Sequence, residues 1–338
     1  MLQIDGSLGE GGGQVLRTSL ALSLVTGTPV SIVGIRARRR RPGLMRQHLT
    51  CVLAAAAVGD ARVDGAALDS RAIEFAPGRV RGGDHRFTVG TAGSTTLVLQ
   101  TVLPALLHAP APSTVTIAGG THNPMAPPYD FVARAFARAL RHMGAKLDVQ
   151  LLRHGFAPAG GGAIASNIGP SRLCPTSFLA RTSGLRGARA LLANLPRHVA
   201  ERELAVVRRR LSVHPEQLRV EEVDAEGPGN MLLVELPGDP FDEVVAIAGE
   251  RGKPAEQVAE EACGRAEALL GTGAAVGEHL SDQLLLPLAI AGGGAMRTVA
   301  PSLHARTNAA VIERFLPVRF EQREDRDGSW VVECRSRS

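Results

Sequence analysis

The chain has 338 residues, enough for one large domain or two of ordinary size. Hydrophobic residues make up 44% of it, as in a globular protein, but aromatic residues make up only 3%, which excludes a nucleic-acid site formed by rows of stacked rings. The net charge of +5 is carried almost wholly by arginine, since Lys146 and Lys253 are the only lysines. An arginine-rich chain is typical of a protein that binds a polyanion, and equally of a GC-rich genome.

The cysteines and the first residues indicate the compartment. Four cysteines are scattered along the chain and form no CxxC pair, so the sequence predicts neither a zinc site nor a disulfide framework. No basic segment precedes an apolar run near the first residue, and no apolar stretch is long enough to cross a bilayer. We therefore expect a cytoplasmic protein that does not enter a membrane.

A glycine-rich loop precedes the first predicted helix, in the segment DGSLGEGGGQVLRTSLALS at residues 5–23. Glycine lets the backbone approach a ligand closely, and a helix N-terminus offers free N–H groups to an anion, so this segment is suited to phosphates. It matches neither the Walker A pattern nor GxGxxG. It also contains a carboxylate, Glu10, which a bare phosphate cradle would avoid, and this favours a metal ion held beside the phosphates.

Three segments of the chain repeat one order of predicted elements: a glycine loop, an apolar helix, a turn and an alternating strand. Each is followed by a second helix and by further strand-like residues, such as AKLDVQLL at residues 145–152. The units read β-α-β-α-β-β and begin near residues 1, 84 and 275. The sequence therefore predicts an α+β fold in which these units form one large domain.

Residues 180–274 differ in character from the repeats. They contain a charged predicted helix, HVAERELAVVRRRL at residues 198–211, then strand-like segments and a second helix. This pattern is typical of a smaller α/β domain with solvated helices. We expect it to be inserted into a large repeat domain made of residues 1–179 and 275–338.

Arginines cluster in the segment RARRRRPGLMRQH at residues 36–48. Five of the six residues 36–41 are arginine and Arg46 follows them, so the segment could track a phosphate backbone; a solvated charge run is the alternative. Arg17 lies one helical turn beyond the glycine loop, where it could form a surface ion pair with Glu10.

Four further residues are polar in apolar surroundings. Asp282 and Gln283 begin a helix whose next turns are apolar, so they lie at its edge and could simply cap it. Gln100 is a single amide in the apolar helix LVLQTVLPALL, where burial is costly unless the group has a partner. His304 follows a predicted strand and precedes a helix, in a place where most histidines are structural.

Five blocks of the sequence, taken together and in order, resemble the RNA 3′-terminal phosphate cyclases. They are IDGSLGEGGGQVLRTSLALS (4–23), RARRRRPGLMRQHLT (36–50), GGTHNPMAPPYDF (119–131), HLSDQLLLPLA (279–289) and PSLHARTNAAVIERFLP (301–317). Each block alone is weakly specific, but the resemblance covers nearly the whole chain. It also implies a fold of repeated β-α-β-α-β-β units with a small inserted domain.

The activity that the resemblance implies is a three-step nucleotidyl transfer that consumes ATP. A histidine attacks the α-phosphate and releases pyrophosphate, AMP passes to an RNA 3′-phosphate, and the neighbouring 2′-OH displaces AMP to close a 2′,3′-cyclic phosphate. The residue that matches the nucleophile is His304. A neutral imidazole is suited to this attack, and Mg²⁺ with arginine is the usual means of neutralising the phosphoryl charge. The implied partners are ATP, Mg²⁺ or Mn²⁺, and an RNA with a 3′-terminal phosphate.

The resemblance also assigns ligand-binding residues. Glu10 and Gln100 match metal- and phosphate-side groups, while Arg17 and the run Arg38, Arg39, Arg40 and Arg41 match basic positions near the phosphates. The residues that match the ATP pocket are Gln100, Pro127, Phe131, His279, Leu280, Ser281, Asp282 and Gln283. Some relatives carry a tyrosine where this chain has His279, and an imidazole can also stack on adenine. Because none of the five blocks lies in residues 180–274, we expect that segment to contribute little to the adenylylation step.

Other functions fit parts of the sequence. A lysine-dependent polynucleotide ligase would need a KxDG motif, and the nearest match, KLDV at residues 146–149, lacks the glycine. A non-catalytic cyclase-like protein that binds RNA in ribosome assembly would share the fold, but those relatives lack the histidine that His304 matches. Adenylylation of an RNA 5′ end at the same site is compatible with the chemistry. The sequence favours a catalytic cyclase.

Overall fold

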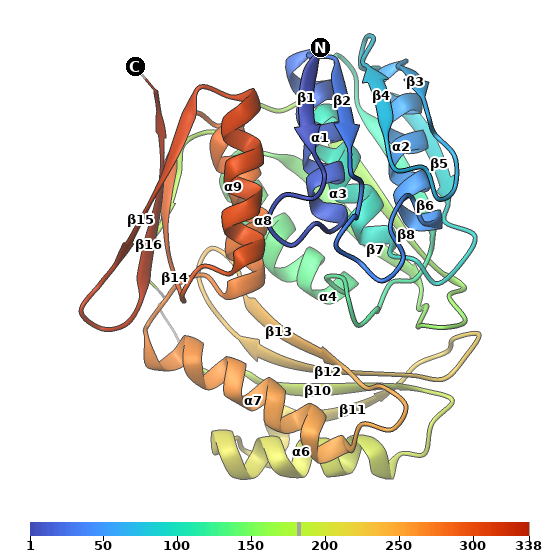
Figure 1. Ribbon diagram of the computed structural model, residues 1–338. Coiled ribbons are helices and arrows are strands. Elements are labelled where there is room, and N and C mark those ends of the chain that lie inside the picture. Colours follow the sequence, from blue (N-terminus) through green and yellow to red (C-terminus); the bar gives the residue numbers. More distant parts are fainter. Residues whose placement is uncertain (181–183, 338) are drawn as a thin grey trace.

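The computed structural model describes residues 1–180 and 184–337, in which three four-stranded sheets share one strand order (Figure 1). In each sheet a helix leads from the first strand to the second, which run parallel. A second helix leads to an antiparallel hairpin formed by the third and fourth strands, and the fourth strand pairs with the second strand. The order is therefore first, second, fourth, third. This is the repeated β-α-β-α-β-β unit that the sequence predicts, and it confirms the α+β fold.

The first two units begin where the sequence predicts. The first consists of β1 (Leu2–Asp5), α1 (Gly13–Thr26), β2 (Val30–Val33), α2 (Arg46–Gly59), β3 (Arg62–Asp64) and β4 (Ile73–Ala76). The second consists of β5 (Gly83–Thr88), α3 (Thr95–Leu107), β6 (Ser113–Gly119), a continuous helical segment of α4 (Tyr129–Phe131), the π-helical η1 (Val132–Phe136) and α5 (Ala137–His142), then β7 (Lys146–Arg153) and β8 (Gly162–Gly169).

The third unit begins earlier than expected. Its first strand is β9 (Thr176–Phe178), which pairs in parallel with β14 (Gly294–Thr298). The other elements are α8 (Glu278–Ile290), α9 (Leu303–Phe315), β15 (Val318–Glu324) and β16 (Trp330–Ser336). The predicted start near residue 275 is therefore wrong, since only an isolated bridge from Val276 to Thr298 forms there. A three-residue strand shows no alternation in the sequence, which is why β9 was missed.

The segment inside the third unit forms a fourth sheet, of order β11-β10-β12-β13. Its elements are β10 (Gly187–Ala193), α6 (His198–Leu211), the 3₁₀ turn η2 (Pro215–Gln217), β11 (Leu218–Glu222), β12 (Gly229–Leu236), β13 (Glu243–Ala248) and α7 (Ala255–Gly271). On β12, Leu232 and Val234 pack into a core of this segment's own, whereas Met231 and Leu233 pack into the core of the repeats. Both faces of the sheet are thus buried, one under α6 and α7 and one against the repeats (Figure 1).

Helices from the three repeats contact one another between their sheets. α1 packs against α2, α3 and α9, and α8 packs against α9. These contacts explain why α1 and α3 are apolar on nearly every side, as is typical of buried helices. In α3 every residue is buried except Gln100, which therefore faces an opening. No helix within the described ranges is long and apolar enough to cross a membrane.

Candidate active site

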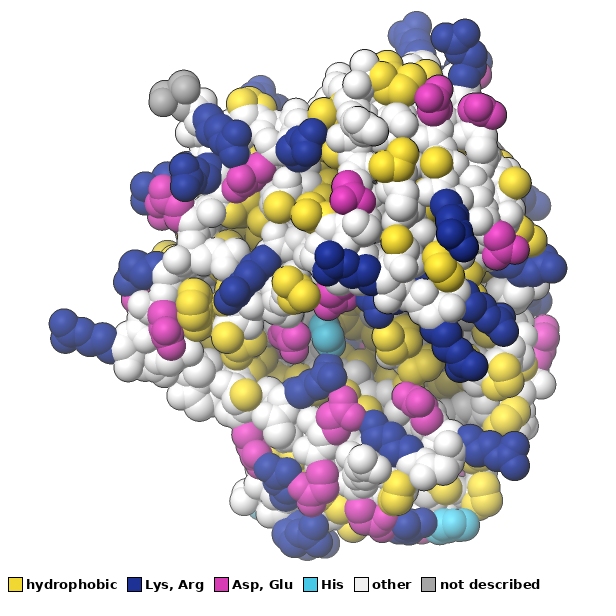
Figure 2. All heavy atoms as spheres, in the orientation of Figure 1, with side chains coloured by type: hydrophobic (Ala, Val, Ile, Leu, Met, Phe, Trp, Pro, Cys, Tyr) yellow, Lys and Arg dark blue, Asp and Glu magenta, His cyan; other side chains and the backbone are white. Residues whose placement is uncertain are grey.

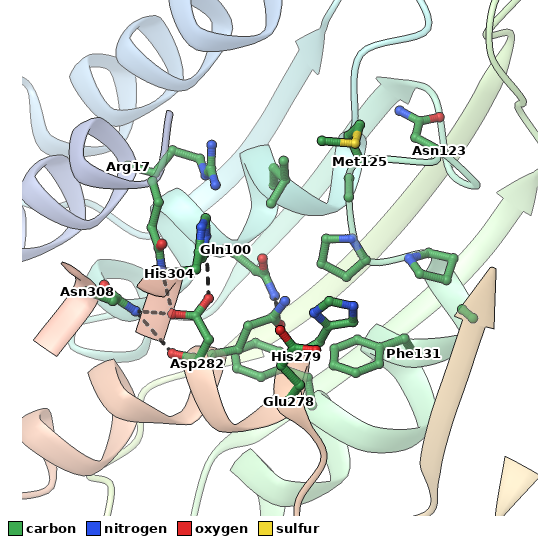
Figure 3. Close-up of a pocket in the computed structure, with 18 of the residues that line it drawn as sticks. Arg17, Gln100, Asn123, Met125, Phe131, Glu278, His279, Asp282, His304 and Asn308 are labelled. Carbon is green, nitrogen blue, oxygen red and sulfur yellow. Dashed lines mark hydrogen bonds and ion pairs between the residues drawn. The ribbon is translucent and has the colours of Figure 1, made fainter. Parts of the chain in front are cut away.

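A cavity of about 530 Å³ opens where the repeat helices meet the inserted segment. Figure 2 shows this face of the molecule as hollowed, with basic and acidic side chains around the hollow and hydrophobic groups within it. Leu97, Leu103 and Phe136 contribute to the apolar part of the lining. Polar side chains from α1, α3, α8 and α9 converge on the same space (Figure 3). A mostly apolar cavity with a few convergent polar groups is typical of a small-molecule site.

Glu10 reaches the cavity because the glycine loop packs against neighbouring residues more closely than side chains on its glycines would allow. Gly9 adopts φ +58°, and a Cβ there would lie 1.9 Å from Thr307 Oγ1 on α9. A Cβ on Gly12, which caps α1, would lie 2.8 Å from Arg39 Nη2. The loop is therefore held between α9 and the arginine-rich segment, with the Glu10 carboxylate in the lining of the cavity.

His304 lies between two carboxylates. It is the second residue of α9, whose N-cap Ser302 accepts a hydrogen bond from Ala305 N through Oγ. The His304 Nδ1 atom is 3.2 Å from Glu10 Oε2, and Nε2 is 3.6 Å from Asp282 Oδ2. About a third of the His304 side chain, 35%, is exposed, so the ring is accessible from the cavity.

Asp282 is the more buried of the two carboxylates and has neutral hydrogen-bond donors. Its Oδ1 atom accepts hydrogen bonds from Gln14 Nε2 at 2.6 Å and from Asn308 Nδ2 at 3.0 Å. Burial raises the pKa of Asp282 above its usual value, although His304, these hydrogen bonds and Arg17 act in the opposite direction. Asp282 therefore holds a proton more readily than an ordinary aspartate.

Arg17 reaches the cavity from α1 with its charge unpaired. Among the residues that the structure describes, no hydrogen bond or ion pair involves its guanidinium, and burial lowers its pKa. The neighbouring His48 is neutral, because burial and the charges of Arg17 and Arg36 lower its pKa to about 3. A partly buried guanidinium without a carboxylate partner is suited to bind an anion.

The residues expected to form the nucleotide pocket divide into two groups. Pro127 and Phe131 line the cavity, as do Gln100, His279, Asp282 and Gln283, and Gln100 donates a hydrogen bond through Nε2 to Gln283 Oε1. Leu280 and Ser281 do not line it. Leu280 is fully buried in the core, and Ser281 is buried and donates a hydrogen bond to the Glu278 carbonyl. Leu280 and Ser281 thus lie on the sides of α8 that pack inside the protein, and their expected contact with ATP stays a prediction.

Part of the arginine-rich segment supports its own loop. The Arg36 side chain is buried and donates hydrogen bonds through Nη1 to the carbonyls of Arg41 and Gly43. It is therefore unavailable to RNA, contrary to the expectation that the whole segment tracks phosphates.

The other arginines of the run lie beside the glycine loop, outside the cavity lining. Arg38 donates to the Gly9 carbonyl at 2.8 Å, and Arg39 donates to Glu10 Oε2 at 2.9 Å. Arg40 and Arg41 are exposed, and within the described part of the chain their side chains make no hydrogen bond or ion pair. These two are the arginines of the run whose side chains have no polar partner in the described ranges.

The inserted segment forms one side of the cavity. Val244 and Ala246 of β13 line it, together with Lys253, Glu261 and Arg265. Residues 180–274 therefore supply part of the cavity wall, and the expectation that they contribute little to the adenylylation step stays a prediction. The sequence analysis relied on motifs that resemble a family. It could not reveal this wall, because small apolar residues and three separate charged side chains form no motif.

Comparison with known proteins decides the family. The sequence model described as RNA 3′-terminal phosphate cyclase matches residues 8–322. The chain belongs to this family. Curated proteins of that name from Pseudomonas fluorescens and Koribacter versatilis are each 52% identical to it, over 100% and 98% of this chain and 99% and 94% of their own lengths. A third, from Ectopseudomonas mendocina, is 50% identical over 94% of this chain and 93% of its own.

The chain is thus an enzyme of the cyclase family, as the five blocks indicate. Among solved structures, the enolpyruvyl transferase NikO from Streptomyces tendae aligns with 48% of this chain and 33% of its own, at 16% identity and a TM-score of 0.27. That likeness is too low to bear on the fold or the site.

The acidic residues of this cyclase do not form a metal site by themselves. Within residues 1–180 and 184–337, no group of three or more His, Cys, Asp or Glu side chains could hold a metal ion. Mg²⁺ in phosphoryl-transfer enzymes is bound by one or two carboxylates together with substrate phosphates. The single carboxylate of Glu10 is compatible with that arrangement, in which the metal ion arrives with the nucleotide.

Sequence reasoning missed the residues that hold Asp282. Gln14 and Thr18 are polar positions four apart on the apolar helix α1, and Thr18 Oγ1 donates to Asn308 Oδ1 at 2.8 Å. Asn308 lies four residues after His304, on the same face of α9. Polar side chains at a spacing of four on buried helices were the signal that could have revealed this network.

Proposed function

We propose that this protein uses ATP to convert the 3′-terminal phosphate of an RNA to a 2′,3′-cyclic phosphate, through a covalent His304–AMP intermediate. The observation that carries the proposal is the position of His304 in a nucleotide-sized cavity, between Glu10 and Asp282 and beside the unpaired charge of Arg17. The full-length similarity to proteins named RNA 3′-terminal phosphate cyclase supports the choice of substrate.

The nucleophilic atom in this proposal is His304 Nε2. Glu10 Oε2 is 3.2 Å from Nδ1, close enough to accept a hydrogen bond from Nδ1–H, and in that tautomer Nε2 carries the lone pair. Asp282 Oδ2 is farther from the ring, at 3.6 Å from Nε2, and burial raises the pKa of Asp282. A carboxyl group that tends toward the neutral form does not hold a proton on Nε2. The ring is thus oriented as a nucleophile by Glu10.

The chemistry then proceeds in three substitutions at phosphorus. His304 Nε2 bonds to the α-phosphorus of ATP, and the bond to the bridging oxygen breaks, so that pyrophosphate leaves. A terminal RNA phosphate oxygen displaces the histidine, which forms an RNA–AMP anhydride. The 2′-OH attacks the RNA phosphorus, its proton is lost, and AMP leaves with the electrons of the anhydride bond. Closure is fast because the 2′-OH is held beside the activated phosphorus.

Ligand-binding roles follow from the cavity lining. We assign Arg17 to the phosphates, because its guanidinium has no partner among the described side chains. Pro127 and Phe131 supply flat apolar surface for the base, and Gln100 and Gln283 supply amides. A divalent metal ion, bound with the nucleotide at Glu10 and Gln100, would neutralise charge on the transferring phosphoryl group. Residues 180–274 form a second domain in this proposal, one that closes the nucleotide site.

Labelling and product analysis test the proposal. Incubation with ATP labelled at the α-phosphate should attach AMP to the protein through an acid-labile, base-stable bond, as expected for a phosphoramidate. An RNA with a 3′-phosphate and a free 2′-OH should then yield the cyclic phosphate, whereas a 2′-deoxy terminus should accumulate the adenylylated end. Release of AMP from the deoxy substrate at the normal rate would mean that water is the acceptor and would contradict the cyclase assignment. Absence of a covalent adduct would favour a non-catalytic RNA-binding role.

A further inference from the structure

A chain of polar contacts connects the inserted segment to His279 at the edge of the cavity. Lys253 Nζ donates to Glu261 Oε2 at 2.6 Å, and Arg265 Nη2 donates to Glu261 Oε1 at 2.8 Å. The other end of the same guanidinium, Arg265 Nη1, is 2.7 Å from His279 Nε2. All four side chains line the cavity, and Figure 3 shows His279 near Phe131.

The contact with Arg265 determines which ring nitrogen of His279 carries a proton. A guanidinium is protonated throughout the accessible pH range and can only donate. At 2.7 Å from Arg265 Nη1, His279 Nε2 must therefore be the acceptor, and a neutral ring then carries its proton on Nδ1. In the described part of the chain Nδ1 has no hydrogen-bond partner, and the ring is open to the cavity. An N–H donor is thus available to a ligand.

We propose that Arg265 is a positioning residue that fixes His279 as a neutral ring with its proton on Nδ1, so that this N–H, which lies in the plane of the ring, donates a hydrogen bond to an acceptor of the bound nucleotide. The identity of the ligand rests on the proposed function. The state of the ring rests on the contacts of His279 alone.

The charges around His279 agree with a neutral ring. His279 is an exposed residue of α8, but desolvation of its ring at the cavity wall lowers its pKa, and Arg265 lowers it further, as does His304. Glu278 and Asp282 act in the opposite direction without reversing the shift. The ring is therefore neutral at pH 7, the state in which one nitrogen accepts from Arg265 and the other donates.

The same geometry links the role of Arg265 to the imidazole at position 279. A tyrosine, which the family resemblance places here in some relatives, has no ring nitrogen to accept from Arg265 and can stack without one. The effect of an Arg265 substitution on the KM for ATP should therefore depend on the imidazole at position 279. This dependence distinguishes positioning through His279 from a direct contact between Arg265 and the ligand.

The state of the ring is measured by ¹⁵N NMR of the whole protein labelled in its histidines, with His279→Phe for assignment. We expect a protonated Nδ1 and an unprotonated Nε2 at pH 7, and in Arg265→Met a shift toward the Nε2–H form. Arg202→Met is the matched control, since Arg202 pairs with Glu256 in the same inserted segment, outside the cavity lining. A protonated Nε2 in the wild-type protein, or no change in Arg265→Met, would overturn the proposal.

The consequence for the nucleotide is measured by the rate of AMP labelling at varied ATP. Arg265→Met should raise KM for ATP about tenfold, the equivalent of one oriented hydrogen bond, and leave kcat within about twofold. In a His279→Tyr background the same substitution should change KM by less than about twofold. An equal tenfold effect in that background would mean that Arg265 acts on ATP directly. If no variant and no wild-type sample is labelled, the proposed function fails, while the NMR result still decides the state of the ring.

Discussion

Two clusters of charged side chains lie close to the cavity, and they differ in how their charges are paired. The first, between the repeats and the inserted segment, is centred on Arg189 of β10, of which only 13% of the side chain is exposed. Arg189 donates to Asp130 at 2.5 Å, to Glu235 at 2.7 Å and to Glu221 at 2.9 Å, and Asp130 is also 3.0 Å from His122. Each of these carboxylates has a cationic partner.

The second cluster, around His304, is incompletely paired. Glu10 pairs with Arg39 and contacts His304, but Asp282 has only His304 as an ionic partner and the neighbouring Arg17 has none in the described ranges. A buried network in which every charge has a partner stabilises the packing of one segment against another. Charged groups that face a cavity without a partner are available to bind a ligand of opposite charge. The comparison teaches that the degree of pairing, more than the number of charges, separates the interface from the site.

The largest expected effect is that of His304→Ala. It should reduce AMP labelling by at least about 1,000-fold, because no other described side chain in our proposal acts as the nucleophile. The melting temperature should change little, since the ring is partly exposed. His198→Ala, an exposed histidine of the inserted segment, is the control. Labelling of the His304→Ala protein, or an adduct mapped to Lys146 or Lys253, would contradict the mechanism.

Asp130→Asn should destabilise the protein by about 3–5 kcal/mol at pH 7, as expected when one partner of a buried ion pair is removed. Burial opposes ionisation of Asp130, but the hydrogen bond and charge of His122 and the charge of Arg189 hold its pKa well below the usual value. A lowered pKa contributes stability above the unfolded value of about 4, and this contribution is lost as the pH falls through the folded value. The difference between wild type and variant in urea unfolding should therefore shrink below about pH 4.

The matched control is Asp60→Asn, because Asp60 pairs with Arg81 on the surface with 62% of its side chain exposed. That exchange should cost less than about 1 kcal/mol. Equal losses in the two variants would show that the interface cluster is no more important than a surface pair.

Glu10→Gln should slow AMP labelling about 30-fold at low Mg²⁺, a moderate effect on the incompletely paired cluster. The amide keeps the shape of the side chain but loses the charge that Arg39 and His304 contact. Excess Mg²⁺ or Mn²⁺ should restore part of the rate, and the part not restored reports the orientation of His304. Asp5→Asn, at the start of the same loop, is the control. An equal loss of rate at every metal concentration would mean that Glu10 does not act through a metal ion.

Glu203 provides a third case, a buried carboxylate that pairs with no cation among residues 1–180 and 184–337. Its Oε2 accepts from Asn230 at 3.1 Å, its Oε1 has no hydrogen-bond partner in those ranges, and burial raises its pKa to about 7. With a raised pKa the wild-type stability is greatest below the unfolded value of about 4.3 and is lost as the pH rises through about 7.

Glu203→Gln removes that loss. The variant should match wild type in urea unfolding near pH 4 and gain of order 1–2 kcal/mol at pH 8. Glu216→Gln, at an exposed glutamate of the same segment, should show no such gain. A variant that is less stable than wild type at pH 8 would mean that the ionised carboxylate has a stabilising partner.

These clusters also show which parts of the fold and of the site could be predicted from the sequence. Local patterns were sufficient for the repeats, because each unit has its own helix and strand periodicity. The blocks around Glu10, Pro127, Asp282 and His304 identified residues that meet in one cavity, although 294 positions separate Glu10 from His304. The pairing of Arg265 with His279 and the burial of Arg36 depend on tertiary packing, and no local pattern encodes them. The start of the third unit was missed because the pairing of β9 with β14 spans the whole inserted segment.

The smallest expected effect concerns the exposed ends of the arginine run. Replacing Arg40 and Arg41 together with alanine should weaken RNA binding only a few-fold at physiological salt, since each side chain would neutralise one phosphate. The slope of log Kobs against log salt concentration should flatten by about 1.4, or about 0.7 for each phosphate of a single strand that is no longer neutralised. Arg62 and Arg79 are exposed arginines outside the run, so their double alanine variant is a matched control with the same change in net charge. If both variants flatten the slope equally, binding responds to the total charge of the protein. A change confined to the Arg40 and Arg41 variant would locate the RNA backbone beside the glycine loop, next to the incompletely paired cluster.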